Sequence, residues 1–412
     1  MPASIDQLCA EVVAAEREGL RVKPVGSGHS FTDIAATDGV RIDLRRLDAV
    51  TAVDGRRVTV QGGMPLHRLN AVLDGHGLAL ENLGDIDRQT VSGAISTGTH
   101  GTGARFGGLA TQVRALELVL PGGHLVRCDA VRDPELFAAA RVGLGAFGVI
   151  ATVTLECRPA FALHADERPM RLGDVVERLD DLVDGNDHVE FFWFPHTDRC
   201  LVKRNNRVDD GRRLRPLSRL RAWLDDDLLA NRVFGLTQEA GTRLPRLVPA
   251  MNGAASRLLG AREYVDRSYR VFVSAREVVF REMEYAVPRD AVVPVLRALQ
   301  DWVDSRDEPV SFPVEVRFGA ADDIWLSPAF GRATAYVAVH QFHRLPHERW
   351  FGAVEKVMTA FGGRPHWGKL HGLDAGRLAA LYPRHADAVR VRDRVDPHRL
   401  LGNRYLERVL GS

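Results

Sequence analysis

The sequence predicts an α+β protein with more than one domain. Its 412 residues exceed one ordinary domain and leave room for two or three. Strand-like alternation of apolar and polar residues occurs in both halves, between segments with helical periodicity. The pattern changes near Arg158, and His188–Phe194 and Cys200–Asn206 then follow as two strands of an antiparallel sheet. Helices and antiparallel strands are therefore expected in separate stretches of the chain.

The composition argues against several classes of protein. A net charge of +1, from 55 basic and 54 acidic residues, argues against a dedicated nucleic-acid binder. The N-terminus lacks the basic start and apolar run of a secretory signal, and no apolar run reaches transmembrane length. The cysteines are scattered without metal-ligand spacing, which predicts reduced thiols in a cytoplasmic protein and no metal site. They are Cys9, Cys128, Cys157 and Cys200.

Lysine is rare in this chain, since arginine supplies almost all of the basic residues. Each lysine is therefore a candidate for a specific role. The four lysines are Lys23, Lys203, Lys356 and Lys369.

Helical and strand patterns alternate through the first 141 residues. Residues 4–18 predict an amphipathic helix, and Pro65 fits the first turn of a second helix that ends near Gly75. Two apolar runs around the turn Pro121–Gly123 predict a hairpin, and Asp133 precedes a short helix that reaches Arg141. The expected strands are Arg21–Pro24, Val40–Leu44, Arg57–Gln61, Arg114–Leu120 and His124–Asp129.

Further strands and helices are expected after Cys200–Asn206. Asp290 is expected to cap a helix that reaches Trp302, and Gly362 to end a helix over His347–Phe361. Two short helices follow in the tail, Ala375–Leu381 and His385–Asp393. The expected strands are Ser268–Ser274, Val278–Val287, Pro309–Phe318 and Ala335–Phe342.

The stretch from Asp209 to Asp227 combines many charges with Leu217, Leu220 and Trp223. A helix that binds a membrane surface or a partner has this composition. A solvated helix on the second domain has it too. We favour the solvated helix, because the aspartates cancel much of the basic attraction.

The first candidate for a binding site is Val25-Gly26-Ser27-Gly28-His29-Ser30-Phe31. Its three small residues remove side chains from the backbone, so peptide N–H groups can face an anion. His29 places a nucleophilic or hydrogen-bonding ring beside them. An isolated loop of this kind is also compatible with an ordinary glycine turn that carries a surface histidine.

A second glycine-rich block runs from Val91 to Gly103 and is nearly devoid of charge. We expect a loop whose hydroxyl and N–H groups approach a phosphate or a sugar hydroxyl. A flexible surface linker is the alternative, although Val91 and Ile95 are poor linker residues.

A third glycine cluster, Gly143–Gly148, matches the dinucleotide-binding pattern GxGxxG. That pattern requires a helix after it. Here the β-branched run Val149–Leu155 follows, which predicts a strand. The Rossmann interpretation therefore fails, but the glycines still allow a close approach to a cofactor.

Polar residues interrupt apolar runs in the second half. In Val314–Phe318, the two-residue period of a strand places Glu315 and Arg317 on one face. His340 lies in the apolar run Ala335–Phe342, and Lys369 follows a turn rich in Gly and Pro. Buried ionisable groups are costly unless they are paired or functional. A structural ion pair with a core histidine remains the alternative to a reaction site.

These motifs occur together, and in this order, in the vanillyl-alcohol-oxidase-type (VAO/PCMH-type) flavoproteins. The chain resembles that superfamily over nearly its whole length, through Gly26–Phe31, Ser92–Gly103, Gly143–Gly148, the Glu-x-Arg pair and His366-Trp367-Gly368-Lys369. Within the superfamily it is most similar to the sugar-lactone oxidases and alditol oxidases. The resemblance implies a two-subdomain FAD-binding domain at residues 1–158, an antiparallel-sheet substrate (cap) domain at 159–370, and a C-terminal segment at 371–412 that returns to the FAD domain.

The resemblance implies that FAD binds between the glycine-rich segments and that His29 is covalently bonded to the flavin. The residues expected to bind FAD are Val25, Gly26, Ser27, Gly28, His29, Ser30, Gly84, Asp85, Ser92, Gly93, Ser96, Thr97, Thr99, His100, Gly101, Gly145, Gly148, Val149, Ile150 and Asn403.

The substrate-side residues implied by the resemblance are Glu315, Arg317, His340 and Lys369. Glu315 would hold substrate hydroxyls, while Arg317 and Lys369 would stabilise the negative charge left near flavin N1 after hydride transfer to N5. His340 or Lys369 would take the hydroxyl proton. The sequence leaves this choice open.

Two positions distinguish the branches of the family. Alditol oxidases carry a substrate-contacting serine where this chain has Asp85, which favours the lactone enzymes. Gly84 falls where related dehydrogenases place alanine, a position linked to oxygen access, which favours an oxidase.

We therefore expect FAD-dependent oxidation of an L-gulono- or D-arabinono-1,4-lactone, with O₂ as acceptor and H₂O₂ as product. The alternatives are oxidation of a polyol such as xylitol or sorbitol, a lactone dehydrogenase with another acceptor, and a flavin-binding protein without turnover.

Overall fold

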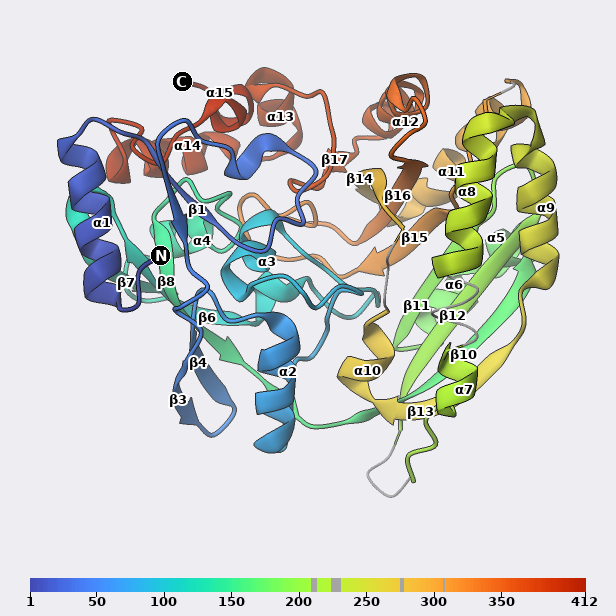
Figure 1. Cartoon of the computed structure of the whole chain (residues 1–412), viewed down its shortest axis with the longest axis horizontal. Coiled ribbons are helices and arrows are strands. Elements are labelled where there is room, and N and C mark those ends of the chain that lie inside the picture. Colours follow the sequence, from blue (N-terminus) through green and yellow to red (C-terminus); the bar gives the residue numbers. More distant parts are fainter. Residues whose placement is uncertain (209–212, 224–230, 275–277, 307) are drawn as a thin grey trace.

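The computed structural model describes residues 1–208, 213–223, 231–274, 278–306 and 308–412. The two largest sheets lie side by side, one in each half of the molecule (Figure 1). Most of the buried apolar residues of both halves belong to one continuous core cluster.

The N-terminal half contains a five-stranded antiparallel sheet with the order β3-β4-β8-β6-β7. The predicted hairpin is confirmed as β6 and β7, and the side chain of Asp133 accepts a hydrogen bond from the Leu136 amide and so caps α4 (Pro134–Ala140). A strand follows the third glycine cluster, as expected. The strands are β3 (Val50–Asp54), β4 (Arg57–Gln61), β6 (Val113–Val119), β7 (Leu125–Asp129) and β8 (Val149–Glu156).

A second, smaller layer completes this half. The strands β1 (Val22–Val25) and β2 (Val40–Asp43) pair in parallel, and α1 (Ile5–Arg17) packs beside them. Leu8 and Val12 of the predicted helical stripe are fully buried there. The other elements of this half are α2 (Leu66–Gly75), α3 (Val91–Thr97), the strand pair β5 (Leu78–Ala79) and β9 (Arg158–Pro159), and the single turns η1 (Asp33–Ala35), η2 (Leu109–Gln112) and η3 (Pro121–Gly123).

The second half is an eight-stranded antiparallel sheet with the order β13-β10-β12-β11-β15-β16-β14-β17. Its apolar face packs against α5 (Leu172–Glu177), α6 (Leu179–Asp184), α11 (Val292–Asp304) and α12 (Glu348–Ala360), so its other face is free to meet the N-terminal half. The strands are β10 (Ala162–Arg171), β11 (His188–Trp193), β12 (Arg199–Val208), β13 (Arg262–Arg267), β14 (Phe280–Pro288), β15 (Val314–Gly319), β16 (Thr334–Phe342) and β17 (Arg364–Pro365).

Most helices of this half lie on its outer side and on its edges, while α10 (Ser268–Phe272) lies between the two halves, next to residues 79–83 (Figure 1). They are α5 (Leu172–Glu177), α6 (Leu179–Asp184), α7 (Arg219–Ala222), α8 (Phe234–Arg243), α9 (Val248–Leu258), α10 (Ser268–Phe272), α11 (Val292–Asp304) and α12 (Glu348–Ala360).

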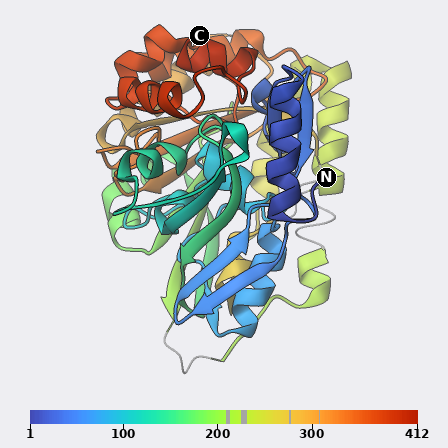
Figure 2. The same ribbon diagram turned by 90° about the vertical axis from the view of Figure 1, so that its left-hand side faces the viewer.

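The C-terminal helices return to the N-terminal half, where both views show them above its sheets (Figures 1 and 2). They are α13 (Ala375–Leu381), α14 (His385–Val395) and α15 (Arg404–Leu410). α14 contacts α4, and α15 contacts η1. Asn403 fixes this return, because its side-chain amide donates to the carbonyls of Asp33, Ile34 and Ala36.

Three expectations about elements were wrong. The block from Val91 to Gly103 begins with helix α3 instead of a loop, because Thr90 caps its start and the left-handed Gly98 (φ +79°) ends it. Ser268–Ser274 is largely the helix α10, and the neighbouring strand is β13. Asp290 lies within a 3₁₀ turn before α11 and does not cap that helix.

The charged stretch Asp209–Asp227 is described only in part. Arg219–Ala222 form the short helix α7, while residues 209–212 and 224–227 lie outside the described residues. In the described part of the chain, no helix has the length and apolar character needed to cross a membrane. The four cysteines are not joined in disulfides, and three of them are buried.

Candidate functional site

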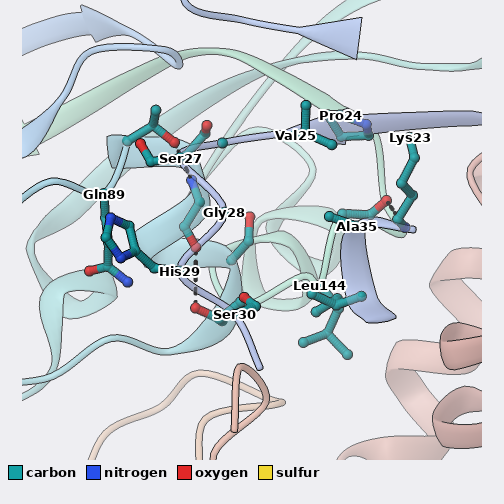
Figure 3. Close-up of a pocket in the computed structure, with 18 of the residues that line it drawn as sticks. Lys23, Pro24, Val25, Ser27, Gly28, His29, Ser30, Ala35, Gln89 and Leu144 are labelled. Carbon is teal, nitrogen blue, oxygen red and sulfur yellow. Dashed lines mark hydrogen bonds between the residues drawn. The ribbon is translucent and has the colours of Figure 1, made fainter. Parts of the chain in front are cut away.

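A cavity of about 220 Å³ lies where β1 ends, between the first glycine-rich loop, α3 and the third glycine cluster (Figure 3). Three separate parts of the sequence therefore meet around it. The predicted cofactor residues that line the cavity are Val25, Gly26, Ser27, Gly28, His29, Ser30, Ser92, Gly93, Ser96, Thr97, Gly145, Gly148 and Ile150.

The shape of the first loop depends on its glycines. Gly28 has φ +76°, a left-handed conformation that favours glycine. A Cβ atom on Gly26 would lie 2.7 Å from Oγ1 of Thr90, the residue that caps α3. The loop can therefore lie directly against the start of α3 only with glycine at this position.

The cavity lining fits the diphosphate of a dinucleotide. Hydroxyl groups of Ser27, Ser30, Thr32, Ser92 and Ser96 surround it together with the peptide groups of the glycines, and Asp33 is the one carboxylate among its lining residues. Such a donor set suits an anion with several acceptor oxygens. These residues, with His29 beside them, could hold FAD.

The sequence interpretation missed part of the lining. The missed residues are Lys23, Pro24, Thr32, Asp33, Ile34, Ala35, Ala36, Leu44, Gln89, Thr90 and Leu144. The rarity of lysine is the one sequence signal that singled out Lys23. Its Nζ donates to the carbonyls of Gly145 (3.3 Å) and Leu401 (3.0 Å). Burial lowers the pKa of Lys23 to about 7, against the opposing effect of Asp396.

His29 lies next to Gln89 in the close-up, away from the Lys23 end of the cavity (Figure 3). Its pKa is lowered, first by partial burial and then by the charge of Lys369. The ring is therefore neutral at pH 7 and keeps a lone pair on one nitrogen. A histidine that forms a bond to a cofactor needs such a lone pair.

Several predicted cofactor residues lie away from this cavity. Val149 is buried in the core. Asn403 does not line the cavity, but its side-chain amide donates hydrogen bonds to the carbonyls of Asp33, Ile34 and Ala36, which do. Oγ1 of Thr99 contacts the side chain of Gln89. The remaining ones, Gly84, Asp85, His100 and Gly101, lie toward the eight-stranded sheet, where Asp85 and His100 bind residues of that sheet.

The central strands of the eight-stranded sheet share one polar face. The register aligns Phe192, Glu315, Ala338 and Glu284 in one row across β11, β15, β16 and β14. The next row is Glu190, Arg317, Tyr336 and Ala286, and Glu282 pairs with His340. Because side chains two residues apart share a face, the acidic and basic residues of both rows lie together. We call the set Glu190, Glu282, Glu284, Glu315, Arg317, Tyr336 and His340 the polar face.

Arg317 is the centre of one cluster on the polar face. Its guanidinium lies 2.9 Å from Glu190 and 3.3 Å from Asp85, and it also contacts Glu315. Burial alone would lower the pKa of Arg317, but these carboxylates raise it well above its usual value. Lys203 binds the other oxygen of Glu190 at 3.2 Å. Glu190 and Lys203 were not among the predicted site residues.

His340 and Lys369 belong to a second cluster, centred on Glu282. Nζ of Lys369 contacts one oxygen of Glu282, and Nε2 of His340 lies 3.5 Å from the other. Burial alone would raise the pKa of Glu282, but Lys369 and His340 outweigh it and hold that pKa well below its usual value. The four predicted substrate-side residues therefore form two groups, each held by carboxylates that the sequence interpretation did not include.

A third cluster contains His100, Glu284 and His366. Nε2 of His100 lies 2.6 Å from Glu284, and its ring stacks on Tyr336 with 3.5 Å between centroids. Their ligand atoms lie close enough together to suit a metal ion. Nδ1 of His366 accepts a hydrogen bond from the Gly368 amide, and the two nitrogens of His100 face the Gly101 carbonyl and Glu284.

The cavity and the polar face are connected through the turn that carries Lys369. The amide of Phe31, at the end of the first loop, donates to the carbonyl of Gly368 at 2.7 Å. Lys369 then lies over the Phe31 ring, 5.4 Å from its centroid. The end of the cavity at His29 therefore lies next to the turn that carries Lys369.

Two family profiles match the chain. The profile of the FAD binding domain matches residues 1–129, and that of D-arabinono-1,4-lactone oxidase matches residues 153–409. The first match contains the glycine-rich loop and α3, and the second contains the whole polar face.

Individual relatives agree with these profiles. The chain is 43% identical to an L-gulono-1,4-lactone dehydrogenase of Mycobacterium tuberculosis, over 100% of this chain and 95% of that protein. It is 35% identical to the L-gulonolactone oxidase of Bos taurus, over 99% and 94%. A cholesterol oxidase from B. sterolicum shares the fold, with a TM-score of 0.83 and 16% identity over 99% of this chain and 93% of that one.

Proposed function

Because the chain belongs to the D-arabinono-1,4-lactone oxidase family, we propose that it oxidises a sugar-acid 1,4-lactone of the L-gulono or D-arabinono type. The observation that carries this proposal is the contact of Phe31 in the cofactor loop with Gly368, next to Lys369, whose ammonium group contacts Glu282 of the polar face. It brings an FAD-binding cavity next to a buried set of acids and bases. Oxidation of a hydroxyl group needs a nearby group that accepts its proton, and this set can supply one.

The residues of the polar face and Lys369 have separable roles in this proposal. Glu315 binds hydroxyl groups of the substrate, and Arg317 holds Glu315 in place through their ion pair. Lys369 supplies positive charge beside the cofactor, and His340 or Lys369 takes the proton of the reacting hydroxyl. When bound, FAD accepts the hydride of the substrate CH–OH group, so that a C=O bond forms.

The polar face also bears on the choice between a lactone and an alditol. Asp85 stands where alditol oxidases have a serine that contacts the substrate, and here it binds Arg317 at 3.3 Å. A residue that is already paired with Arg317 is poorly placed to replace that serine. We therefore propose a lactone as the substrate.

We propose that the FAD is bonded to His29. The support is the position of His29 on the cavity wall and its lowered pKa, which leaves a nitrogen lone pair. We also propose a cytoplasmic location, since four unpaired cysteines fit a reducing compartment.

We propose O₂ as the electron acceptor, with H₂O₂ as the product. Relatives of this chain carry both names, oxidase and dehydrogenase. The support is Gly84, which falls at the position linked to oxygen access in the family. A Cβ atom there would lie 3.1 Å from the carbonyl oxygen of His100 and 3.2 Å from Cγ2 of Thr99, so alanine would crowd a position that glycine leaves open.

Gly84→Ala is expected to slow reoxidation of the flavin by O₂ by about tenfold or more, which corresponds to an increase of about 1.4 kcal/mol in the activation free energy. The rate of anaerobic reduction by the lactone is expected to stay within about threefold of the wild-type rate. Stopped-flow absorbance measures both half-reactions. The control is Gly173→Ala on α5, where a Cβ atom meets nothing within 4 Å. Unchanged reoxidation in Gly84→Ala would refute a role of Gly84 in oxygen access.

A further inference from the structure

We propose that Glu282 is a positioning residue that assigns different roles to His340 and Lys369. Its contact with Lys369 keeps that side chain as the cation beside the cofactor. His340 is then the proton acceptor, and Glu282 stabilises the positive charge that His340 gains with the proton. The inference rests on the proposed function and deepens it, because it decides which of the two residues is the base.

The hydrogen bonds of His340 indicate which of its nitrogens is free. Nδ1 lies 3.3 Å from the carbonyl oxygen of Pro313, and a carbonyl can only accept, so Nδ1 carries the proton. In a neutral ring Nε2 then holds a lone pair. Within the described part of the chain, Nε2 makes no hydrogen bond although the residue is 4% exposed, and Oε1 of Glu282 is the polar atom that faces it, at 3.5 Å. In its neutral form, His340 therefore accepts a proton at Nε2.

Aromatic rings fix the orientation of that acceptor. Phe280 packs edge-on against the His340 ring, with 5.1 Å between centroids, and Phe312 lies 6.0 Å away. Phe280 also packs against Phe31 of the cofactor loop at 5.7 Å. The apolar rings exclude water from the base and connect it to the loop.

Lys369 is unsuited to the same task. Its ammonium group contacts Oε2 of Glu282, which is 5% exposed and whose lowered pKa keeps it ionised. An ammonium group has three protons and no lone pair, so it cannot accept a proton.

Glu282 joins the two residues through opposite oxygens. Oε1 lies 3.5 Å from Nε2 of His340, and the two residues are register partners on β14 and β16. When the hydroxyl O–H bond breaks, its proton binds Nε2, while the C–H hydride carries two electrons to the FAD and the carbonyl forms. The carboxylate then faces an imidazolium, which it stabilises.

The test compares four variants of the flavin-loaded enzyme: Glu282→Gln, Glu282→Asp, Lys369→Met and the control Glu167→Gln. Glu167 is a buried carboxylate of the same sheet that pairs with Arg262 at 2.8 Å, away from the polar face. Two quantities are measured. One is the midpoint reduction potential of the bound flavin without substrate, and the other is kcat and KM with the lactone.

Glu282→Gln is expected to raise the potential, because a negative charge is lost, and Lys369→Met to lower it. Glu282→Gln is expected to reduce kcat by about 10–100-fold, a part of the 10²–10⁴-fold that a general base contributes, with KM changed by less than threefold. Glu282→Asp keeps the charge and is expected to hold the potential near the wild-type value. The control is expected to change neither quantity.

The proposal is wrong if Glu282→Gln leaves both the reduction potential and the kinetic constants unchanged. It is also wrong if Glu282→Gln and Glu282→Asp shift the potential equally, because an equal shift indicates a purely structural role of Glu282. The potential is measured without a lactone. A failure of the proposed function, in which no lactone reduces the wild-type flavin, is therefore distinguishable from a failure of this inference.

Discussion

Arg317→Met is expected to reduce the free energy of unfolding by about 3–5 kcal/mol and to abolish lactone oxidation, because removal of one partner leaves buried charges uncompensated. The guanidinium of Arg317 compensates three carboxylates, those of Asp85, Glu190 and Glu315. Methionine has a similar volume but no charge, so the carboxylates would repel one another in the interior. Urea unfolding of the flavin-loaded protein, followed by fluorescence, measures the loss.

Arg171→Met is the matched control for this prediction. Arg171 lies on β10 of the same sheet and pairs with Asp198 at 3.1 Å, but its side chain is 75% exposed. Exposed ion pairs contribute about 0–1 kcal/mol. Equal unfolding midpoints for Arg317→Met and wild type would contradict the ion-pair cluster described for Arg317.

His29→Ala is expected to abolish covalent attachment of the flavin completely. After acid denaturation, the wild-type polypeptide should remain yellow, while the variant should release its flavin into the supernatant. The reason is that His29 supplies a neutral ring nitrogen on the cavity wall. Absorbance of the washed pellet near the flavin maximum measures the attached fraction.

His67→Ala is the control, since His67 is an exposed histidine on α2 that does not line the cavity. Its pellet should stay yellow. If the His29→Ala pellet is yellow as well, the flavin is bonded to another residue. If the wild-type pellet is colourless, the flavin is bound without a covalent bond.

The sequence predicted the local structure around the candidate site well. Period-two spacing correctly placed Glu315 and Arg317 on one face of β15. The loop at Gly26–Ser30 was recognised because small residues in a row leave a clear pattern. The run after Gly148 was correctly interpreted as a strand, since β-branched residues dominate it.

The partners of the predicted residues could not be found in this way. Glu282 and Glu284 alternate with apolar residues in β14, a pattern that equally describes a strand with one face in solvent. Only the order and register of the strands bring Glu282 opposite His340. Pairing between distant strands leaves no local signal in a single sequence.

The helix α3 was missed for a different reason. Its seven residues are mostly small, and serine, threonine and glycine favour turns over helix interiors. The Thr90 cap and the left-handed Gly98 stabilise it from outside the segment. The place of Asn403 behind the cavity likewise depends on a contact across more than 360 residues of chain.

Anaerobic titration of the purified protein with sugar compounds is the most direct test of lactone oxidation by bound FAD. L-Gulono-1,4-lactone, D-arabinono-1,4-lactone, xylitol and sorbitol are added separately, and bleaching of the flavin absorbance is followed. One of the two lactones is expected to bleach the flavin fully at one equivalent, and the polyols are expected to act far more slowly. Bleaching by the polyols alone, or by none of the four compounds, would contradict lactone oxidation at this site.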